Sequence, residues 1–354
     1  MSADTTPALP PPLGEISNFS NPPNSNAEAQ AGIIICLIVT FSAVLIRAYS
    51  RIFRMKAVRI QDCIALLAFG LYIGFVYLLF WFMSFCGYYV HQWNISASDI
   101  PTVLHIVYLG MVMYELTIMG LKISILTEWI HLFVPRGTRS TFYWTCVAVL
   151  SVNVMYYSSS ILATTFVCNP RGMLCSKSSV IFICSAAVNL ASDIVILVLP
   201  INTVWHLQLP RRKKINISLV FALGILCCAS AAVRLAKAIE SFVSPDKTYT
   251  LSAVTLWVLT EATCAFLVFC VPAAPKAFKG SRLASVLFGS ASTQGQSRGE
   301  IGPSTRSWPR SVYAQLPPAS RAHQRNGVPL QKLHPVVRSV PGPSESSEQL
   351  RETG

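Results

Sequence analysis

Charged side chains are scarce in this chain, since Asp, Glu, Lys and Arg make up only 12% of its 354 residues. Soluble domains carry about 25% charged residues, so a chain with half that share cannot cover an ordinary water-facing surface. Hydrophobic residues make up 53% of the sequence, and the mean hydropathy is +0.51. These values exclude a pair of soluble domains and indicate an integral membrane protein.

The sequence also lacks the short motifs that mark catalytic and metal sites. It contains no phosphate-binding loop, no His-Glu-x-x-His and no Cys-x-x-Cys pair. Serines are abundant, but none has a candidate base nearby in the sequence. We therefore expect neither an enzyme nor a metal site.

Basic residues are in excess, with a formal net charge of +13, which raises the question of whether the chain binds nucleic acid. A nucleic-acid binder gathers Lys and Arg on one face or stripe, with aromatic residues among them. Here the basic residues lie in short loops and in the C-terminal tail, so we expect no nucleic-acid partner.

Seven long apolar runs are present, and a bilayer-spanning helix needs about 20 such residues. The sequence therefore predicts an all-α integral membrane protein, a bundle of seven transmembrane helices. The predicted spans are 31–48, 61–84, 102–127, 143–166, 179–201, 215–237 and 250–272.

Lys and Arg in the short loops predict the orientation, because basic loops stay in the cytoplasm. The loops predicted to be outside hold only Arg171, Lys177, Lys237 and Lys247. The N-terminus is therefore expected outside and the C-terminus in the cytoplasm. The residues on the predicted inner side are Arg47, Arg51, Arg54, Lys56, Arg59, Arg136, Arg139, Arg211, Arg212, Lys213, Lys214, Lys276, Lys279 and Arg282.

Polar segments flank the seven-helix membrane domain, which we place at residues 31–280. Residues 1–30 are rich in Pro, Ser and Asn and contain no Lys or Arg, so we expect a short disordered extracellular segment. Residues 281–354 are basic and rich in Ser and Pro, which is typical of a disordered cytoplasmic tail.

Ionisable residues within the spans are the candidate functional groups, because charge inside a bilayer is costly. One interpretation is a polar cavity that binds a ligand or relays protons. The other is that the groups pair with one another and fix the helix packing. The predicted intramembrane cluster comprises Glu115, Lys122, Asn189, Asp193, Arg234 and Glu261.

Retinal is not expected as a cofactor, because its Schiff base needs a buried lysine on the last helix. The predicted seventh span, residues 250–272, contains no lysine. Lys247 precedes that span in an outer loop and is too exposed for this role. No other cofactor is indicated.

Two covalent modifications are predicted on the outer side. Cys168 and Cys175 flank a short, turn-rich outer loop and are the first candidates for a disulfide, with Cys86 bonded to one of them as the alternative. Asn18 and Asn94 lie in Asn-x-Ser sequons on the same side, so both are candidate glycosylation sites.

Several of these residues also form a pattern across spans five to seven. Asn189 to Asp193, then Leu199 with Pro200, and Glu261 in the seventh span resemble the fungal rhodopsin-like-domain membrane proteins, which include Pth11-type receptor-like proteins and a satratoxin-cluster membrane protein. The resemblance covers roughly residues 31–280. Of that group's outer-side Gly-x-Gly-x-His motif, Gly87 and His91 are present, while Tyr89 replaces the middle glycine.

The resemblance implies a receptor-like protein, in the plasma membrane, that senses an extracellular or membrane-soluble ligand. Its basic inner loops and tail would meet a cytoplasmic signalling partner. The alternative is a transporter or accessory protein of a biosynthetic pathway that uses the midplane carboxylates as a substrate or proton path. Coupling to G proteins is less favoured, because the third span ends in Glu128-Trp-Ile and the seventh lacks Asn-Pro-x-x-Tyr.

Overall fold

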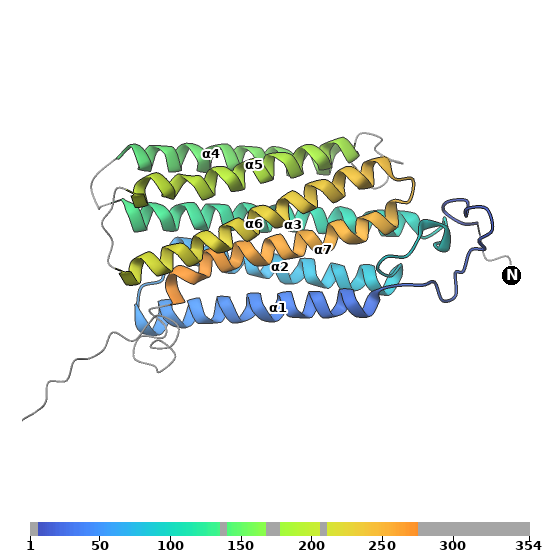
Figure 1. Ribbon diagram of the computed structural model, residues 1–354, viewed down its shortest axis with the longest axis horizontal. Coiled ribbons are helices and arrows are strands. Elements are labelled where there is room, and N and C mark those ends of the chain that lie inside the picture. Colours follow the sequence, from blue (N-terminus) through green and yellow to red (C-terminus); the bar gives the residue numbers. More distant parts are fainter. Residues whose placement is uncertain (1–5, 135–139, 168–177, 206–210, 275–354) are drawn as a thin grey trace, which may run out of the picture. The chain divides into compact units, whose positions relative to one another are not determined.

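Seven long helices dominate the computed structural model, which describes residues 6–134, 140–167, 178–205 and 211–274 (Figure 1). All seven are long and apolar enough to cross a membrane, which confirms the predicted number of spans. They are α1 (Asn26–Tyr49), α2 (Ile60–Phe85), α3 (Ile100–Phe133), α4 (Thr141–Val167), α5 (Ser178–Trp205), α6 (Arg211–Val243) and α7 (Lys247–Cys270).

Several helices are longer than the apolar runs that predicted them. α3 has 34 residues and α6 has 33, so each is roughly 50 Å long at 1.5 Å per residue. A bilayer core is only about 30 Å thick. Helical hydrogen bonding needs no apolar side chains, so these helices continue into polar sequence beyond the hydrocarbon.

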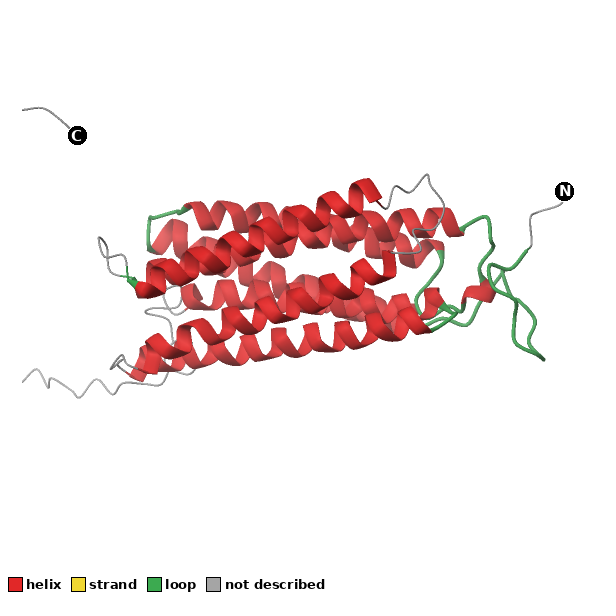
Figure 2. Ribbon diagram, turned by 90° about the horizontal axis from the view of Figure 1, so that it is seen from above, coloured by secondary structure: helices red, strands yellow, loops and turns green. Residues whose placement is uncertain are grey.

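The chain runs up and down through the bundle, as Figures 1 and 2 show. We call the end where α1, α3, α5 and α7 begin the N-terminal side, and the opposite end the C-terminal side. α3 packs against α2, α4, α5 and α7, while α7 packs against α1 and α6. Side chains of α3 and α7 therefore meet those of most other helices.

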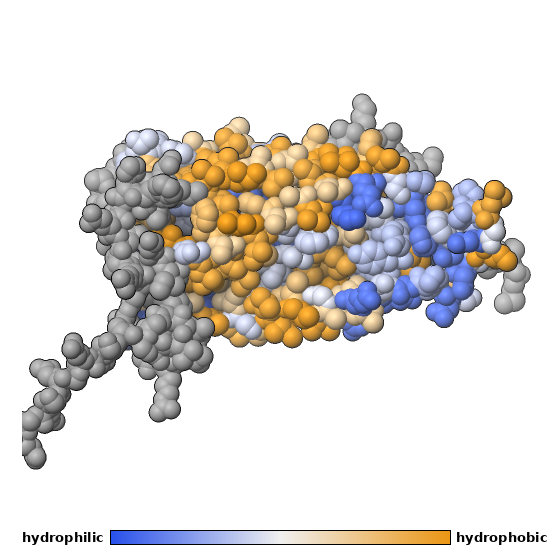
Figure 3. Space-filling model, viewed as in Figure 1, coloured by the Kyte–Doolittle hydropathy of each residue, from blue (hydrophilic) through white to orange (hydrophobic). Residues whose placement is uncertain are grey.

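The outer surface of the bundle is apolar over its middle, where large side chains face outward. Ile35 is 60% exposed, Leu67 69% and Met155 73%. Figure 3 shows apolar residues across the middle of the visible face and hydrophilic residues gathering toward the end at which the N-terminus lies. Such a surface is suited to lipid and not to water.

α2 makes close contacts with α7 and with α3 in the interior of the bundle. The rings of Tyr72 and Phe266 meet edge to face with centroids 5.4 Å apart, and the Tyr72 hydroxyl lies 3.0 Å from Thr263 Oγ1. α2 and α3 approach closely at Gly120, where a Cβ would lie 3.2 Å from the Cβ of Ala68. Small residues at such crossings are typical of membrane helices.

Part of the N-terminal segment that we expected to be disordered has defined partners. The amide of Ala8 donates to the carbonyl of Ile95 at 3.0 Å, and the amide of Asn18 donates to Asn94 Oδ1 at 3.0 Å. This segment therefore contacts the α2–α3 connection at some of its residues, while Leu13 and Ile16 are fully exposed. The predicted cytoplasmic tail, residues 281–354, lies outside the described residues.

A short π-helix, Ser50–Arg54, extends α1 at the C-terminal side. Its wider turn is marked by the Met55 amide, which donates to the carbonyl of Ser50 at 2.9 Å, five residues earlier. Single π turns within helices often lie at functional sites. This one ends a helix that carries two buried arginines, described below.

Candidate functional site

A buried ion pair joins α6 to α7. Arg234 Nε lies 2.7 Å from Glu261 Oε2, and Glu261 is only 1% exposed. The hydroxyl of Tyr114, on α3, donates to the other carboxylate oxygen of Glu261 at 2.6 Å. Three helices thus converge on one carboxylate.

Asn189, on α5, extends this group toward α3 and α4. Its Nδ2 donates to Glu261 Oε1 at 2.5 Å, and its Oδ1 accepts hydrogen bonds from Lys122 Nζ at 2.9 Å and from the Tyr157 hydroxyl. Lys122 Nζ also lies 2.9 Å from Asp193 Oδ1. We call Tyr114, Lys122, Tyr157, Asn189, Asp193, Arg234 and Glu261 the central network.

Five of the six predicted cluster residues therefore lie together in the central network. The sixth, Glu115, is buried but forms its hydrogen bonds elsewhere, because Ser160 and Ser185 donate to its Oε1 at 2.7 and 3.3 Å. Sequence reasoning did not find Tyr114 and Tyr157. Aromatic residues are common in membrane spans. Only the rotation of α3 and α4, which turns these two tyrosines toward the network, distinguishes them from the other aromatic residues.

An apolar cavity lies above the central network, on the N-terminal side. It contains about 750 Å³ of space not filled by protein atoms, including space that is open to the outside. Its polar lining comprises Tyr114, Glu115, Ser185, Arg234 and Thr255. Most of its apolar walls come from α2, α3 and α7, among them Phe75, Leu79, Phe82, Val107, Val254 and Val258.

A second cavity lies on the C-terminal side of the same network, between α3, α5, α6 and α7. It contains about 880 Å³, and its walls include Trp129, Pro200 and Phe221. Lys122, Asp193 and Glu261 line it as well. The central network therefore lies between two cavities.

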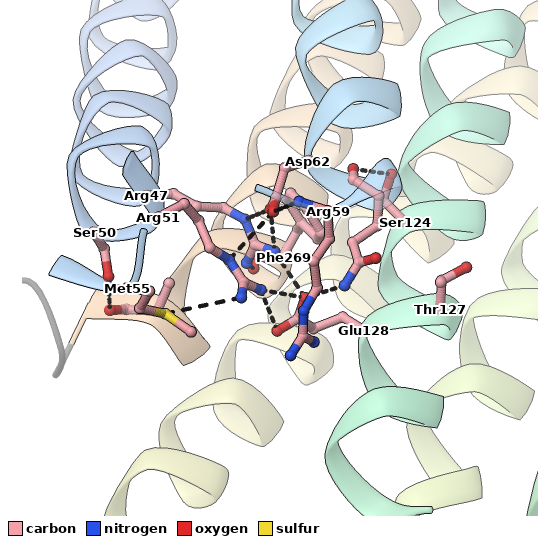
Figure 4. A network of polar contacts seen from close by, with 12 residues as sticks. Arg47, Ser50, Arg51, Met55, Arg59, Asp62, Ser124, Thr127, Glu128 and Phe269 are labelled. Atoms are coloured by element: carbon pink, nitrogen blue, oxygen red, sulfur yellow. Dashed lines mark hydrogen bonds and ion pairs between the residues drawn. The ribbon is translucent and has the colours of Figure 1, made fainter. Parts of the chain in front are cut away.

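A cluster of ion pairs closes the C-terminal side of the bundle (Figure 4). Arg47 lies 2.7 Å from Asp62 Oδ1 and 2.9 Å from Glu128 Oε2, and Arg51 contacts the same two carboxylates. Arg47 also donates to the carbonyl of Phe269 at 2.6 Å, which ties α1 to α7. We call Arg47, Arg51, Asp62 and Glu128 the end cluster.

The end cluster corrects our interpretation of two basic residues. We placed Arg47 and Arg51 in the first inner loop, but they lie on the helix of α1 and its π turn and are 4% and 3% exposed. The apolar run ends before the helix does, so the pattern could not place them. A usable signal was the pair of acids, Asp62 and Glu128, close to the ends of two other spans.

Gly87 and His91, the two residues of the predicted outer-side motif, lie on the N-terminal side, in the α2–α3 connection. His91 Nδ1 lies 2.6 Å from Asp246 Oδ2, and its ring stacks between Trp93 and Tyr249. Gly87 has φ +78°, and a Cβ there would lie 2.9 Å from Val90 Cγ2. This glycine is therefore required by the local backbone.

Among the predicted modification sites, Cys86 has a free, buried thiol that donates to the carbonyl of Phe82. Burial raises the pKa of this thiol to about 12, which keeps it protonated and unreactive. Cys168 and Cys175 lie outside the described residues. Asn18 is exposed, whereas Asn94 is buried.

No group of three or more His, Cys, Asp and Glu suited to a metal ion occurs among the described residues. A Schiff base to retinal needs a buried lysine on the last helix. The only lysine of α7 is its first residue, Lys247. Its amine is exposed and donates to the carbonyls of Ser241 and Phe242.

Comparison with known proteins places these features in a family. The model of the fungal rhodopsin domain matches residues 46–280. No solved structure matches the chain. The matched region begins just before Arg47 and includes the end cluster, both cavities and the central network.

Two curated fungal proteins are similar to this chain. "Fugralins biosynthesis cluster protein 2" of Gibberella zeae is 38% identical over 285 residues, covering 77% of this chain and 71% of that protein. "SAT4 family membrane protein" of Emericella nidulans is 29% identical over 230 residues, covering 63% of this chain and 56% of that protein. This chain is a multi-pass membrane protein that belongs to the fungal rhodopsin domain family.

Proposed function

We propose that this chain is a plasma-membrane receptor-like protein that senses a membrane-soluble small molecule without retinal and without catalysis. The observation that carries the proposal is the N-terminal-side cavity. It has apolar walls and a polar floor, as sites for small ligands do. Two of its polar residues, Tyr114 and Arg234, belong to the central network.

Binding in this cavity could be transmitted to the other side of the bundle. Arg234 lines the cavity and pairs with Glu261, which in turn contacts Asn189 of α5. A ligand that fits one arrangement of these helices better than another shifts the population between them. In this proposal the basic inner loops and the tail transmit that shift to a cytoplasmic partner.

The relative from Gibberella zeae supports a metabolite as the ligand of this chain. It is described as a protein of a fugralins biosynthesis cluster, and proteins encoded beside a pathway often act on its compounds. We therefore favour a small product or intermediate of biosynthesis over a peptide, in keeping with the apolar walls of the cavity.

The test is to fill the cavity and measure sensing. Gly110 lines the cavity, so Gly110→Leu places a side chain within it, while Gly70 is exposed and has no heavy atom within 4 Å of an added Cβ. A fungal deletion strain would be complemented with wild type, Gly110→Leu or the control Gly70→Leu. Transcription would then be compared after exposure to fungal metabolite extracts.

We expect wild type and Gly70→Leu to restore a transcriptional response that Gly110→Leu lacks at equal abundance in the membrane. An unchanged response from Gly110→Leu would overturn the proposal.

A second candidate function is transport of a biosynthetic product, and one observation favours it. The central network, which includes Asp193 and Glu261, lies between a cavity on each side, as a substrate site near the midplane of a transporter does. In this case Asp193→Asn would abolish export of the compound while leaving the protein abundant. Measurement of intracellular and extracellular metabolite separates this outcome from loss of sensing.

A further inference from the structure

Two side chains that line the N-terminal-side cavity each carry a buried polar atom with no hydrogen-bond partner among the described residues. The atoms are Oε2 of Glu115 and Nη2 of Arg234. Both side chains line the cavity, and they are 3% and 6% exposed. The hydroxyls of the lining are satisfied, since Tyr114 donates to Glu261, Ser185 to Glu115 and Thr255 to the carbonyl of Ser252.

Unsatisfied polar atoms of charged groups are costly to bury, so nearly all of them find a partner in native proteins. Here one atom is an acceptor and the other a donor, on side chains that line one apolar cavity. A ligand that supplies the complementary donor and acceptor would satisfy both. Its remaining surface would meet Phe75, Val254 and Val258.

The charges around the cavity argue against an acidic ligand. Arg234 pairs with Glu261, and Lys122 pairs with Asp193. Glu115 has two serine hydroxyls as partners and forms no ion pair among the described residues, so an ionised Glu115 has no paired cation to neutralise it. An anion placed beside that ionised carboxylate would be repelled in a medium of low dielectric constant.

We propose that the cavity binds a neutral, largely hydrocarbon molecule that carries a hydroxyl and a carbonyl at one end. The hydroxyl donates to Glu115 Oε2, and the carbonyl oxygen accepts from Arg234 Nη2. This inference rests on the proposed function and names the chemical class of its ligand.

The experiment uses the full chain in lipid nanodiscs and measures the shift in its thermal unfolding midpoint with added probe. The probes are 1-hydroxydodecan-2-one, dodecan-2-one, dodecan-1-ol and dodecanoic acid, which share one chain length. They carry both groups, the carbonyl alone, the hydroxyl alone and an anionic carboxylate, respectively.

The variants are Glu115→Gln, which keeps the shape of the side chain and removes its charge, and the control Thr164→Val. Thr164 also has a buried hydroxyl without a partner among the described residues, but it lines neither cavity described above. Partition of each probe into the lipid is the same for every variant, so it cancels in the comparison.

We expect 1-hydroxydodecan-2-one to raise the midpoint of wild type and Thr164→Val most, with the other probes giving smaller shifts. Loss of one hydrogen bond to a charged group weakens binding by roughly tenfold or more. Glu115→Gln should therefore need about ten times more hydroxyketone for the same shift. If Glu115→Gln does not fold, the ranking of the four probes on wild type still decides.

Equal shifts from the ketone, the alcohol and the hydroxyketone would overturn the inferred ligand class while leaving a ligand-binding cavity in place. A larger shift from dodecanoic acid would overturn it as well, because that ranking requires an anionic ligand. No shift with any probe would also overturn the class. The complementation test with Gly110→Leu decides the proposed function separately.

Discussion

Arg234 Nε lies 2.7 Å from Glu261 Oε2, so that a cation of α6 and a carboxylate of α7 form a buried pair inside the bundle. The pair is surrounded by Tyr114 and Asn189, which both donate to the carboxylate. Such a pair holds helices in register only while both partners are present. Replacing one partner, and then both, therefore tests how much the pair contributes to stability.

Glu261→Gln should destabilise the protein by roughly 3–5 kcal/mol, because it leaves Arg234 buried without its counter-ion. The double variant Arg234→Gln with Glu261→Gln should be less unstable than the sum of the two single variants. Titration with SDS in mixed micelles gives the free energies of unfolding. Additive effects would show that the two side chains do not interact.

Glu128→Gln should also destabilise the bundle, because Glu128 accepts hydrogen bonds from Arg47, Arg51 and Gln61. Loss of its charge leaves two guanidinium groups with Asp62 as their remaining carboxylate. The matched control is Lys237→Gln, which breaks the exposed pair with Glu240. We expect a lower thermal midpoint for Glu128→Gln and an unchanged one for the control.

The N-terminus should face outward and the C-terminus the cytoplasm, as the distribution of Lys and Arg predicts. Reporter fusions at the two ends, one active only in the cytoplasm and one only in the secretory lumen, measure this directly. A cytoplasmic signal from the N-terminal fusion would reverse the orientation and would place His91 and Asp246 inside.

Asn18 should carry most of any N-linked glycan. Its side chain is exposed, whereas Asn94 is 7% exposed and its Oδ1 accepts the Asn18 amide. Removal of the glycan by Asn18→Gln should increase mobility on a gel, and Asn94→Gln should not. Mobility that changes only with Asn94→Gln would mean that the α2–α3 connection opens before it is modified.

Much of this arrangement could be predicted because bilayer physics constrains sequence strongly. Long apolar runs give the helices, and an isolated charge within a run, such as Asp193 or Glu261, must find a partner. The partner itself depends on the rotation and tilt of each helix, which no local pattern specifies. For this reason Glu115 could be predicted to be buried but not to lie apart from Glu261.

The end cluster shows the complementary difficulty. A basic residue just after an apolar run is typical of an inner loop, and the exposed Lys56 fits that pattern. Arg47 and Arg51 differ only because α1 continues past its apolar run and because two acids face them from α2 and α3. That information lies in three separate segments of the chain.

The π turn at Ser50–Arg54 has a consequence for how sequence length can vary in this family. A π turn contains one residue more than an α turn, so deletion of one residue there can be absorbed by a change to α geometry. The same deletion within α2 or α3 would rotate every following side chain by about 100°. Relatives that differ by one residue in this part of the chain should therefore differ at this turn.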